Sequence, residues 1–303
     1  PPGISSVVRI EGQTRSGGFH PVHRHPLAQT CYRMESGGFR ERRSAMNPLK
    51  RALIEKLGHD NGFEHVQASD PRGVVLASAR HSASAKVVAQ PTAGYVLHLR
   101  AGTPVLLPEM SRTFAQQGGA GGFFAESEAN LAALLRRAAG LARALPSQAA
   151  QDFEVSVASQ LAQLPAGIGS TEVERLVRQR VGQQKFREAM LDYWGGTCAV
   201  TGLALPEVLR ASHAKPWSEC ESDAERLDVF NGFLLVANLD ALFDRFLISF
   251  DDEGRLLVSS RIKHAELVCL GLVEGMSLRW LTDAHRAYLA WHRANCDDVT
   301  SSV

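Results

Sequence analysis

The chain has 303 residues, 45% of them hydrophobic, and its formal net charge is +1. This length gives room for two domains of ordinary size, and the hydrophobic content is sufficient for buried cores. The near-neutral charge excludes a protein that is basic throughout, so any surface for nucleic acid must be local.

The five cysteines are widely and irregularly spaced, at Cys31, Cys198, Cys220, Cys269 and Cys296. They form no Cys-x-x-Cys pair, which argues against a zinc knuckle and a disulfide framework and favours a reducing compartment. No apolar run approaches the ~18 residues of a membrane span, and no secretory leader is evident. We therefore expect a cytoplasmic protein.

Residues 1–45 differ from the rest of the chain. They are rich in Gly, Ser, Arg and His and lack apolar periodicity, which predicts a disordered tail or translated upstream sequence with Met46 as the natural start. Seven Lys and Arg stand against three Asp and Glu here, so a basic arm that contacts DNA stays open. His20, His23 and His25 have no neighbouring residues that would complete a metal site.

Residues 46–145 are predicted to form a separate α+β domain. Helical patterns cover Pro48–Leu57 and Ser127–Leu145. Short strands are expected at Phe63–Gln67, Gly73–Ser78, Ser84–Gln90, Tyr95–Arg100 and Pro104–Pro108. Gln116–Gly122 is a glycine-rich loop without the Gly-Lys-Ser/Thr ending of a phosphate-binding loop. By fold-level analogy, such a domain selects a target or senses a small molecule or a modified base.

Residues 146–170 are predicted to form a linker, with one or two amphipathic turns within Val155–Leu164. A C-terminal domain is then expected over residues 171–303. It opens with a helix, Thr171–Trp194, for which Ser170 or Thr171 can serve as N-cap. This helix carries five cations, which fit either phosphate contact or a solvated face: Arg175, Arg178, Arg180, Lys185 and Arg187.

The stretch from Leu209 to Phe250 combines a histidine with paired acids. Strands are expected at Val208–Ser212 and Gly232–Val236, and a helix at Asn238–Arg245 with Asn238 as its cap. Asp240 and Asp244 are four residues apart, so they lie on one face of that helix. Two such carboxylates repel each other, and we expect a raised pKa for at least one of them.

The elements after this helix are expected at Leu247–Phe250, Arg255–Ser259 and Thr282–Ala294. A hairpin that carries His213, followed by a helix with two acids, is a compact place to hold a divalent metal beside a general base.

Several blocks of this stretch resemble the HNH nucleases of the ββα-metal fold, and most of all the bacterial branch of restriction-type HNH endonucleases. The blocks are Ser212-His-Ala-Lys-Pro-Trp217, Arg226-Leu-Asp228, Asn231-Gly-Phe-Leu-Leu235, Leu239-Asp-Ala-Leu-Phe-Asp244 and Leu247-Ile-Ser-Phe-Asp251. The resemblance extends upstream through Arg178–Arg187 and Tyr193–Gly202 and covers roughly residues 171–262. It implies an α+β fold with a C-terminal ββα-metal nuclease domain.

The resemblance implies roles for five residues. His213 matches the general base, and Asn231 matches the middle Asn that braces the loop holding the base. Asp240 and Asp244 match the metal-binding positions. Ser212 stands where other members carry Asp or His as a further ligand. With two firm carboxylates, the site favours one Mg²⁺ or Mn²⁺ over zinc.

Five cations near these blocks are candidate DNA contacts, with ordinary surface pairing as the alternative for each. They are Lys185, Arg187, Lys215, Arg226 and Arg245.

The implied function is a metal-dependent DNA endonuclease that leaves a 5′ phosphate and a 3′ hydroxyl, in bacterial restriction or defence against foreign DNA. The alternative is a DNA-binding or signal-sensing regulator with an inactive or ligand-gated HNH domain. A homodimer is left open.

Overall fold

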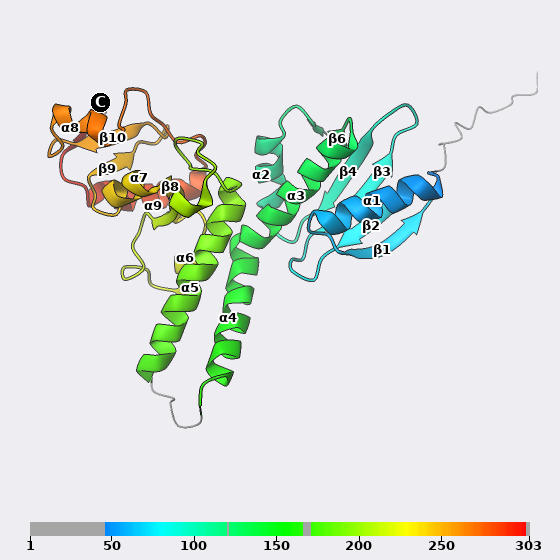
Figure 1. Ribbon diagram of the computed structural model, residues 1–303, viewed down its shortest axis with the longest axis horizontal. Coiled ribbons are helices and arrows are strands. Elements are labelled where there is room, and N and C mark those ends of the chain that lie inside the picture. Colours follow the sequence, from blue (N-terminus) through cyan, green and yellow to red (C-terminus); the bar gives the residue numbers. More distant parts are fainter. Residues whose placement is uncertain (1–45, 120, 166–170, 301–303) are drawn as a thin grey trace, which may run out of the picture. The chain divides into compact units, whose positions relative to one another are not determined.

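The computed structural model describes residues 46–119, 121–165 and 171–300, and it has the mixed α+β architecture that the sequence predicts (Figure 1). The predicted tail at residues 1–45, with its three histidines, and the candidate cap Ser170 lie outside the described residues. No helix in the described ranges is long and apolar enough to cross a membrane.

The N-terminal part contains an antiparallel sheet with the strand order β1-β2-β3-β4-β6-β5. The strands are β1 His65–Asp70, β2 Gly73–Ala77, β3 Ser84–Ala89, β4 Tyr95–Arg100, β5 Gly118–Gly119 and β6 Gly122–Ala125. Alternate side chains of the central strands, such as Val74, Leu76, Val87 and Leu97, are buried, as expected for a sheet with one covered face.

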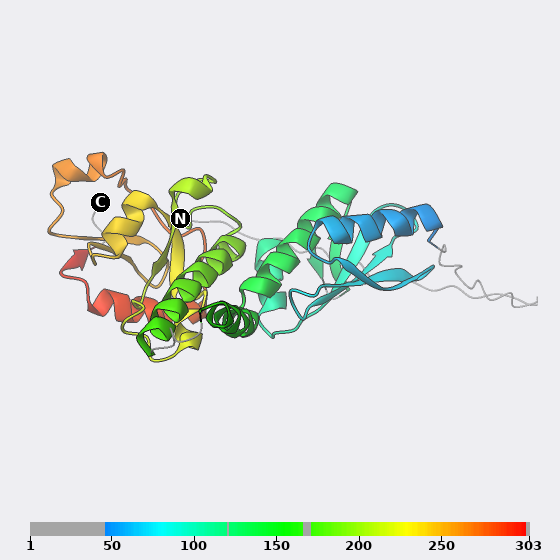
Figure 2. The same cartoon turned by 60° about the horizontal axis from the view of Figure 1, so that its bottom comes forward.

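Two helices cover that face. They are α1 Pro48–Asp60 and α3 Glu128–Ala144, and Figure 2 shows both on the same side of the sheet. Each begins at a polar N-cap: the side chain of Asn47 accepts from the Lys50 amide, and that of Ser127 accepts from the Asn130 amide. Within the described ranges, no helix covers the opposite face of this sheet.

Two predictions for this part were wrong. The expected strand Pro104–Pro108 is instead the start of helix α2 Leu106–Thr113, in which Leu106 and Met110, four residues apart, are both buried. The glycine-rich loop contains the β5–β6 hairpin. A Cβ at Gly122 would lie 2.6 Å from the Leu97 carbonyl oxygen, so a glycine is needed where β6 approaches β4.

The predicted linker is largely helical. Helix α4 Pro146–Ala162 buries Phe153 and Val157, four residues apart, and lies beside α5 Thr171–Trp194 (Figure 1). Its many Gln, Ser and Ala residues hid this narrow apolar stripe from the sequence analysis. Pro146 is compatible with the helix because it stands in the first turn, where its missing N–H is not needed.

The C-terminal part is built around a two-stranded hairpin and the helix that follows it. Strands β7 Leu209–His213 and β8 Gly232–Val236 pair antiparallel, with His213 opposite Gly232, and α7 Ala237–Phe243 follows at once. A Cβ at Gly232, the first residue of β8, would overlap the Ser212 carbonyl oxygen, so glycine is required where the two strands meet. The remaining elements are η1 Pro206–Val208, α6 Asp223–Arg226, β9 Ile248–Phe250, β10 Leu256–Ser259, α8 His264–Cys269, α9 Asp283–Ala294 and β11 Val299–Thr300.

The predicted cap of α7 was wrong. The N-cap is Val236, and the Asn238 side chain instead donates to the Leu270 carbonyl at 2.7 Å.

Helices α3 and α5 connect the two parts. Arg143 forms an ion pair with Asp192 at 2.9 Å, and Arg137 donates to the Asp192 carbonyl at 2.8 Å. Residues 43–303 form one compact unit. The division into domains at residues 46–145 and 171–303 therefore stays a proposal.

Candidate active site

A pocket of about 500 Å³ opens beside the β7–β8 hairpin and α7. Its lining includes His213 from β7, Asp240 from α7 and Asp244, which directly follows α7. Three of the residues that the sequence analysis selected for chemistry are thus brought to one hollow. The other lining residues are Gln183, Phe186, Arg187, Arg210, Ala211, Pro216, Trp217, Phe246 and His292.

The imidazole of His213 is held on two sides. It stacks on the Phe186 ring with centroids 3.7 Å apart, and its Nε2 lies 2.9 Å from the Arg226 carbonyl oxygen. Because a carbonyl only accepts hydrogen bonds, Nε2 must carry the proton, which leaves Nδ1 as the free acceptor. Burial lowers the pKa of His213 to about 4, although the bond to Arg226 acts in the opposite direction. The imidazole is therefore neutral at neutral pH.

Asn231 is the last residue of the loop between β7 and β8, and it is fully buried. Its Oδ1 accepts from the Lys215 amide at 2.8 Å, and its Nδ2 donates to the carbonyls of Lys215 and Glu225, each at 3.2 Å. These bonds tie together the two ends of the loop that supplies the Arg226 carbonyl. Asn231 does not line the pocket, so its geometry suits the bracing role that the resemblance implies.

The two carboxylates belong to α7 and its C-cap: Asp240 is in the first turn of the helix, and Asp244 directly follows its last residue. The Asp244 amide donates to the Asp240 carbonyl at 2.9 Å, which places the residues one helical turn apart. Although Asp244 as a whole is exposed, burial of its carboxyl group raises its pKa to about 6, and the nearby charge of Asp240 adds to this shift while Arg245 opposes it. Repulsion between the two acids is thus present, as the sequence analysis expects.

Ser212 is buried and donates its hydroxyl hydrogen to Oδ1 of Asp240. This contact orients the Asp240 carboxylate. The structure therefore places Ser212 behind one of the two acids, and it does not place Ser212 among the residues that line the pocket.

The donor set has to be tested against the divalent metal that the resemblance implies. Among the described residues, no three His, Cys, Asp or Glu side chains come together as a metal-binding group. Two carboxylates at one pocket do suit Mg²⁺ or Mn²⁺, which is commonly bound through one or two carboxylates and keeps several waters. A cation would also relieve the repulsion that raises the pKa of Asp244. The residues fit a water-rich Mg²⁺ or Mn²⁺ site and do not fit a four-ligand zinc site.

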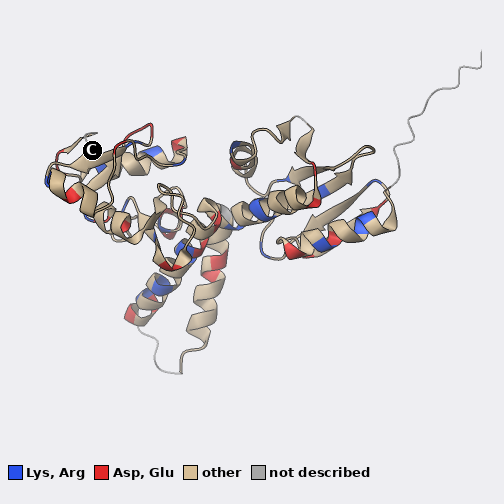
Figure 3. Cartoon of the chain, turned by 45° about the horizontal axis from the view of Figure 1, so that its top comes forward, with Lys and Arg blue, Asp and Glu red and all other residues tan. Residues whose placement is uncertain are grey.

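The predicted DNA-contacting cations on α5 and just after α7 differ in their partners. Lys185 forms an ion pair with Glu188 at 3.2 Å. Arg187 lines the pocket and donates to the Leu209 carbonyl at 2.7 Å. Arg245 is exposed and has no ion pair with another described residue. Helix α5 carries both Lys or Arg and Asp or Glu residues along its length (Figure 3).

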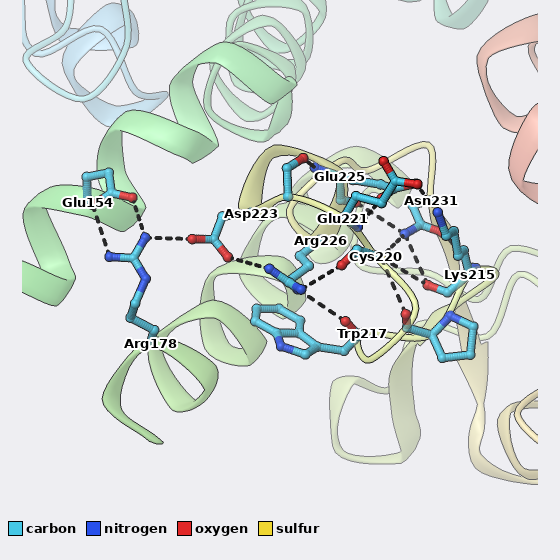
Figure 4. A network of polar contacts seen from close by, with 12 residues as sticks. Glu154, Arg178, Lys215, Trp217, Cys220, Glu221, Asp223, Glu225, Arg226 and Asn231 are labelled. Carbon is cyan, nitrogen blue, oxygen red and sulfur yellow. Dashed lines mark hydrogen bonds and ion pairs between the residues drawn. The ribbon is translucent and has the colours of Figure 1, made fainter. Parts of the chain in front are cut away.

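The two predicted cations of the β7–β8 loop are occupied within that loop. Lys215 forms an ion pair with Glu225 at 2.8 Å. Arg226 donates to the carbonyls of Trp217 at 3.1 Å and Cys220 at 2.6 Å (Figure 4). These contacts shape the loop, so Arg226 acts first on the protein itself.

Several residues of the pocket were given no role from the sequence, among them Arg210, Trp217, Phe246 and His292. Arg210 is an exposed cation on β7, and its position three residues before His213 was an available signal. Trp217 is the last residue of the block Ser212–Trp217 that carries part of the resemblance. Phe246, which has a positive φ of 58°, and His292 reach the pocket from after α7 and from α9, and no local pattern connects them with His213.

The hairpin, the helix that follows it, and the half-buried imidazole at the same pocket as two acids form the arrangement that the ββα resemblance predicts. Residues 198–251 match the family described as HNH endonuclease, so the predicted family is confirmed for this part of the chain. The restriction-type branch and the wider extent over residues 171–262 stay predictions. The match contains His213, Asn231, Asp240 and Asp244. It assigns to the domain a nuclease activity on nucleic acid. No curated protein matches the chain.

Proposed function

We propose that the chain is a metal-dependent HNH endonuclease that hydrolyses phosphodiester bonds of DNA. The observation that carries this proposal is that one pocket, inside the segment matching the HNH family, is lined by a neutral imidazole and two carboxylates. Hydrolysis of a phosphodiester needs an acceptor for the proton of water and positive charge beside the phosphate. The imidazole can accept the proton, and the two carboxylates can hold a cation that supplies the charge.

In the proposed reaction, Nδ1 of His213 takes the proton from the attacking water. The bond from Nε2 to the Arg226 carbonyl holds the ring in the tautomer that leaves Nδ1 free. A bound phosphate brings negative charge to the imidazole, which raises its pKa from about 4 towards the working pH. The bond from phosphorus to the 3′ oxygen breaks, that oxygen takes a proton from solvent to become a hydroxyl, and the phosphate remains on the 5′ oxygen.

Asp240 and Asp244 would hold Mg²⁺ or Mn²⁺ in this proposal. When bound, the ion supplies positive charge to the scissile phosphate and to the leaving oxygen. Ser212 keeps Asp240 oriented through its hydroxyl. Arg245 and Arg210, both exposed and near the pocket, are the cations best placed to contact flanking phosphates.

The biological role that we propose is bacterial restriction or defence in the cytoplasm, with residues 46–145 choosing the target. On the uncovered face of the sheet, exposed Lys86 lies directly opposite exposed His98, and exposed Arg100 follows on the same strand. Such a face suits a nucleic-acid backbone. A small molecule or modified base as ligand of this part, and a homodimer, remain alternatives.

The rival proposal is a regulator with an inactive or ligand-gated HNH domain. A plasmid-nicking assay decides between them. The endonuclease predicts nicked product with Mg²⁺ or Mn²⁺ and none with a chelator. DNA binding without cleavage under any divalent metal would favour the regulator, and cleavage that needs an added small molecule would favour the gated form.

A further inference from the structure

Arg178 connects three helices in the C-terminal part of the chain. Its guanidinium, on α5, forms ion pairs with Glu154 of α4 at 2.7 Å and with Asp223 of α6 at 2.6 Å. It also lies 5.0 Å from the centre of the Phe153 ring. Figure 4 shows Arg178 between the two carboxylates. A planar guanidinium can engage two acids at once, which an ammonium does less well.

The contacts continue from Asp223 to the carbonyl that holds the base. Asp223 forms a second ion pair with Arg226 at 3.0 Å, and the Arg226 side chain is also bound to the Cys220 carbonyl. The backbone carbonyl of Arg226 accepts the Nε2 hydrogen of His213. The side chain of Arg226 is thus fixed by Asp223, and its carbonyl fixes the imidazole.

Asn231 restrains the same place from the other side, because its amide donates to the carbonyl of Glu225, the residue before Arg226. The Arg226 carbonyl therefore lies between two restraints. Asn231 belongs to the known motif, whereas Arg178 lies on a helix far from it in sequence and outside the matched residues 198–251.

We propose that Arg178 is a positioning residue for His213. Through Asp223 and Arg226, it holds the Arg226 carbonyl where it keeps His213 in the tautomer with Nε2 protonated. It also joins α4 to this loop, so a change in α4 is transmitted to the base. The proposal deepens the endonuclease proposal above and rests on it for its effect on cleavage.

A direct role of Arg178 in DNA binding is the main competitor. With Arg175 and Arg226 it lines a second hollow of about 640 Å³, which shares Trp217 with the first. The charge of Arg178 is already matched by two carboxylates, which disfavours a phosphate contact. Arg175, three residues earlier on α5, is exposed and has no ion pair with another described residue, so it provides a matched control.

The test compares Arg178→Gln with Arg175→Gln in the full chain. The tautomer of His213 is read by ¹⁵N NMR of the imidazole, with His213→Ala giving the assignment. DNA affinity is measured by fluorescence anisotropy without metal, and kcat and KM by nicking with Mg²⁺. We expect Arg178→Gln to mix the His213 tautomers and to lower kcat roughly 10- to 100-fold, the usual size for residues that orient a functional side chain. KM and DNA affinity should stay unchanged, and Arg175→Gln should alter neither the tautomer nor kcat.

A second variant, Asp223→Asn, cuts the same connection from its other side and should shift the tautomer in the same way. An unchanged His213 tautomer in a folded Arg178→Gln or Asp223→Asn protein overturns the proposal. Weaker DNA binding by Arg178→Gln with an unchanged tautomer would overturn it in favour of a DNA contact. Because the tautomer is measured without cleavage, an inactive parent protein would count against the endonuclease and leave this test intact.

Discussion

His213, which is half-buried, differs from the buried histidines of the C-terminal part in what surrounds it. His285 and His292 are buried and neutral, with pKa values lowered by burial to about 3 and about 4. Both ring nitrogens of His292 are hydrogen-bonded, one to the Ser249 hydroxyl and the other to the Phe243 carbonyl, at 3.0 Å each. In His213 only Nε2 is hydrogen-bonded, to the Arg226 carbonyl, and the ring lies at the same pocket as two acids. Burial alone therefore does not mark a base.

The first prediction concerns this base. His213→Ala should lower the nicking rate by roughly 10²- to 10⁴-fold, because proton transfer to a positioned group contributes about that much. DNA affinity without metal should stay close to that of the parent, and a folded protein should be seen by circular dichroism. Equal nicking by variant and parent would remove His213 from the mechanism.

The second prediction concerns the paired acids. The variant with both Asp240→Asn and Asp244→Asn should lose Mg²⁺-dependent nicking, because both carboxylate charges are gone. It should be at least as stable as the parent at neutral pH. Burial and repulsion raise the pKa of Asp244 to about 6, so its ionised form destabilises the fold once pH exceeds its ordinary range. An amide at position 240 can still accept from Ser212.

Chemical denaturation at about pH 7 and about pH 4 measures this effect. The stability gain of the double variant should be present at the higher pH and much smaller at the lower pH, where Asp244 is protonated in the folded chain and its ordinary pKa of 3.8 leaves it only partly ionised in the unfolded chain. A variant that unfolds at neutral pH would show that these acids hold the fold together and that a metal, if bound, lies elsewhere.

At the scale of single elements, Gly182 determines how α5 meets the loop that follows β7. A Cβ at this position would overlap the ring of Trp217. Glycine costs a helix interior ~1 kcal/mol relative to alanine, so its presence suits this close contact. Gly182→Ala should therefore displace Trp217 from the pocket and reduce nicking.

The control is the same substitution in a Trp217→Ala background. There the ring is absent, and Gly182→Ala should raise the melting temperature through helix propensity alone. A gain in melting temperature of the same size in both backgrounds would show that Trp217 moves aside without cost.

A buried histidine of α9, His285, leads us to expect that stability depends on pH. His285 is fully buried, with Nδ1 bonded to the Thr282 hydroxyl at 2.8 Å and no partner for Nε2 among the described residues. Burial lowers its pKa to about 3, below the ordinary value near 6.5. Between these two values the unfolded chain binds the proton more readily, so the free energy of unfolding should fall as pH falls, by at most about 1.4 kcal/mol per pH unit for this group.

Urea denaturation at several pH values tests this. His285→Phe should flatten the fall between about pH 6.5 and pH 3 relative to the parent. Replacing the exposed His264 of α8 by Gln is the matched control for loss of a histidine without change to the core. A parent protein whose stability is constant over this window would contradict the prediction.

At the scale of the whole molecule, a stable fragment that contains the HNH domain should include α4. Phe153 and Val157 of α4 are buried, and α4 lies beside α5. A fragment of residues 146–303 keeps this packing, whereas a fragment of residues 171–303 exposes it. Burial of two such side chains contributes roughly 3–6 kcal/mol, so the shorter fragment should be clearly less stable.

We expect the longer fragment to nick DNA, though with less selectivity than the full chain, since all proposed catalytic residues lie within it. Thermal melts and nicking assays of both fragments provide the measurement. A folded longer fragment that is inert even at high Mn²⁺ would show that residues 46–145 complete or activate the site. Equal melting temperatures of the two fragments would show that α4 adds nothing to stability.

Many elements of the C-terminal part could be predicted from local sequence patterns. The bounds of α5 and β8 agree with the prediction, and the acids at Asp240 and Asp244 lie at one pocket as their spacing indicates. Where the pattern was weak, as in the Gln- and Ser-rich α4, or short, as in α2, the prediction failed. Burial in these helices depends on neighbours that only the folded chain supplies.

The sequence by itself determined the HNH family, the hairpin with its helix, and the histidine and acids proposed for chemistry, because these are carried by short motifs at a recognisable spacing. Only the tertiary structure decided what each cation does. Arg226 and Lys215 turn inward to hold a loop, and Arg178 reaches Asp223, 45 residues further along the chain. An ion pair between such distant residues depends on how helices pack, and no local spacing encodes that packing.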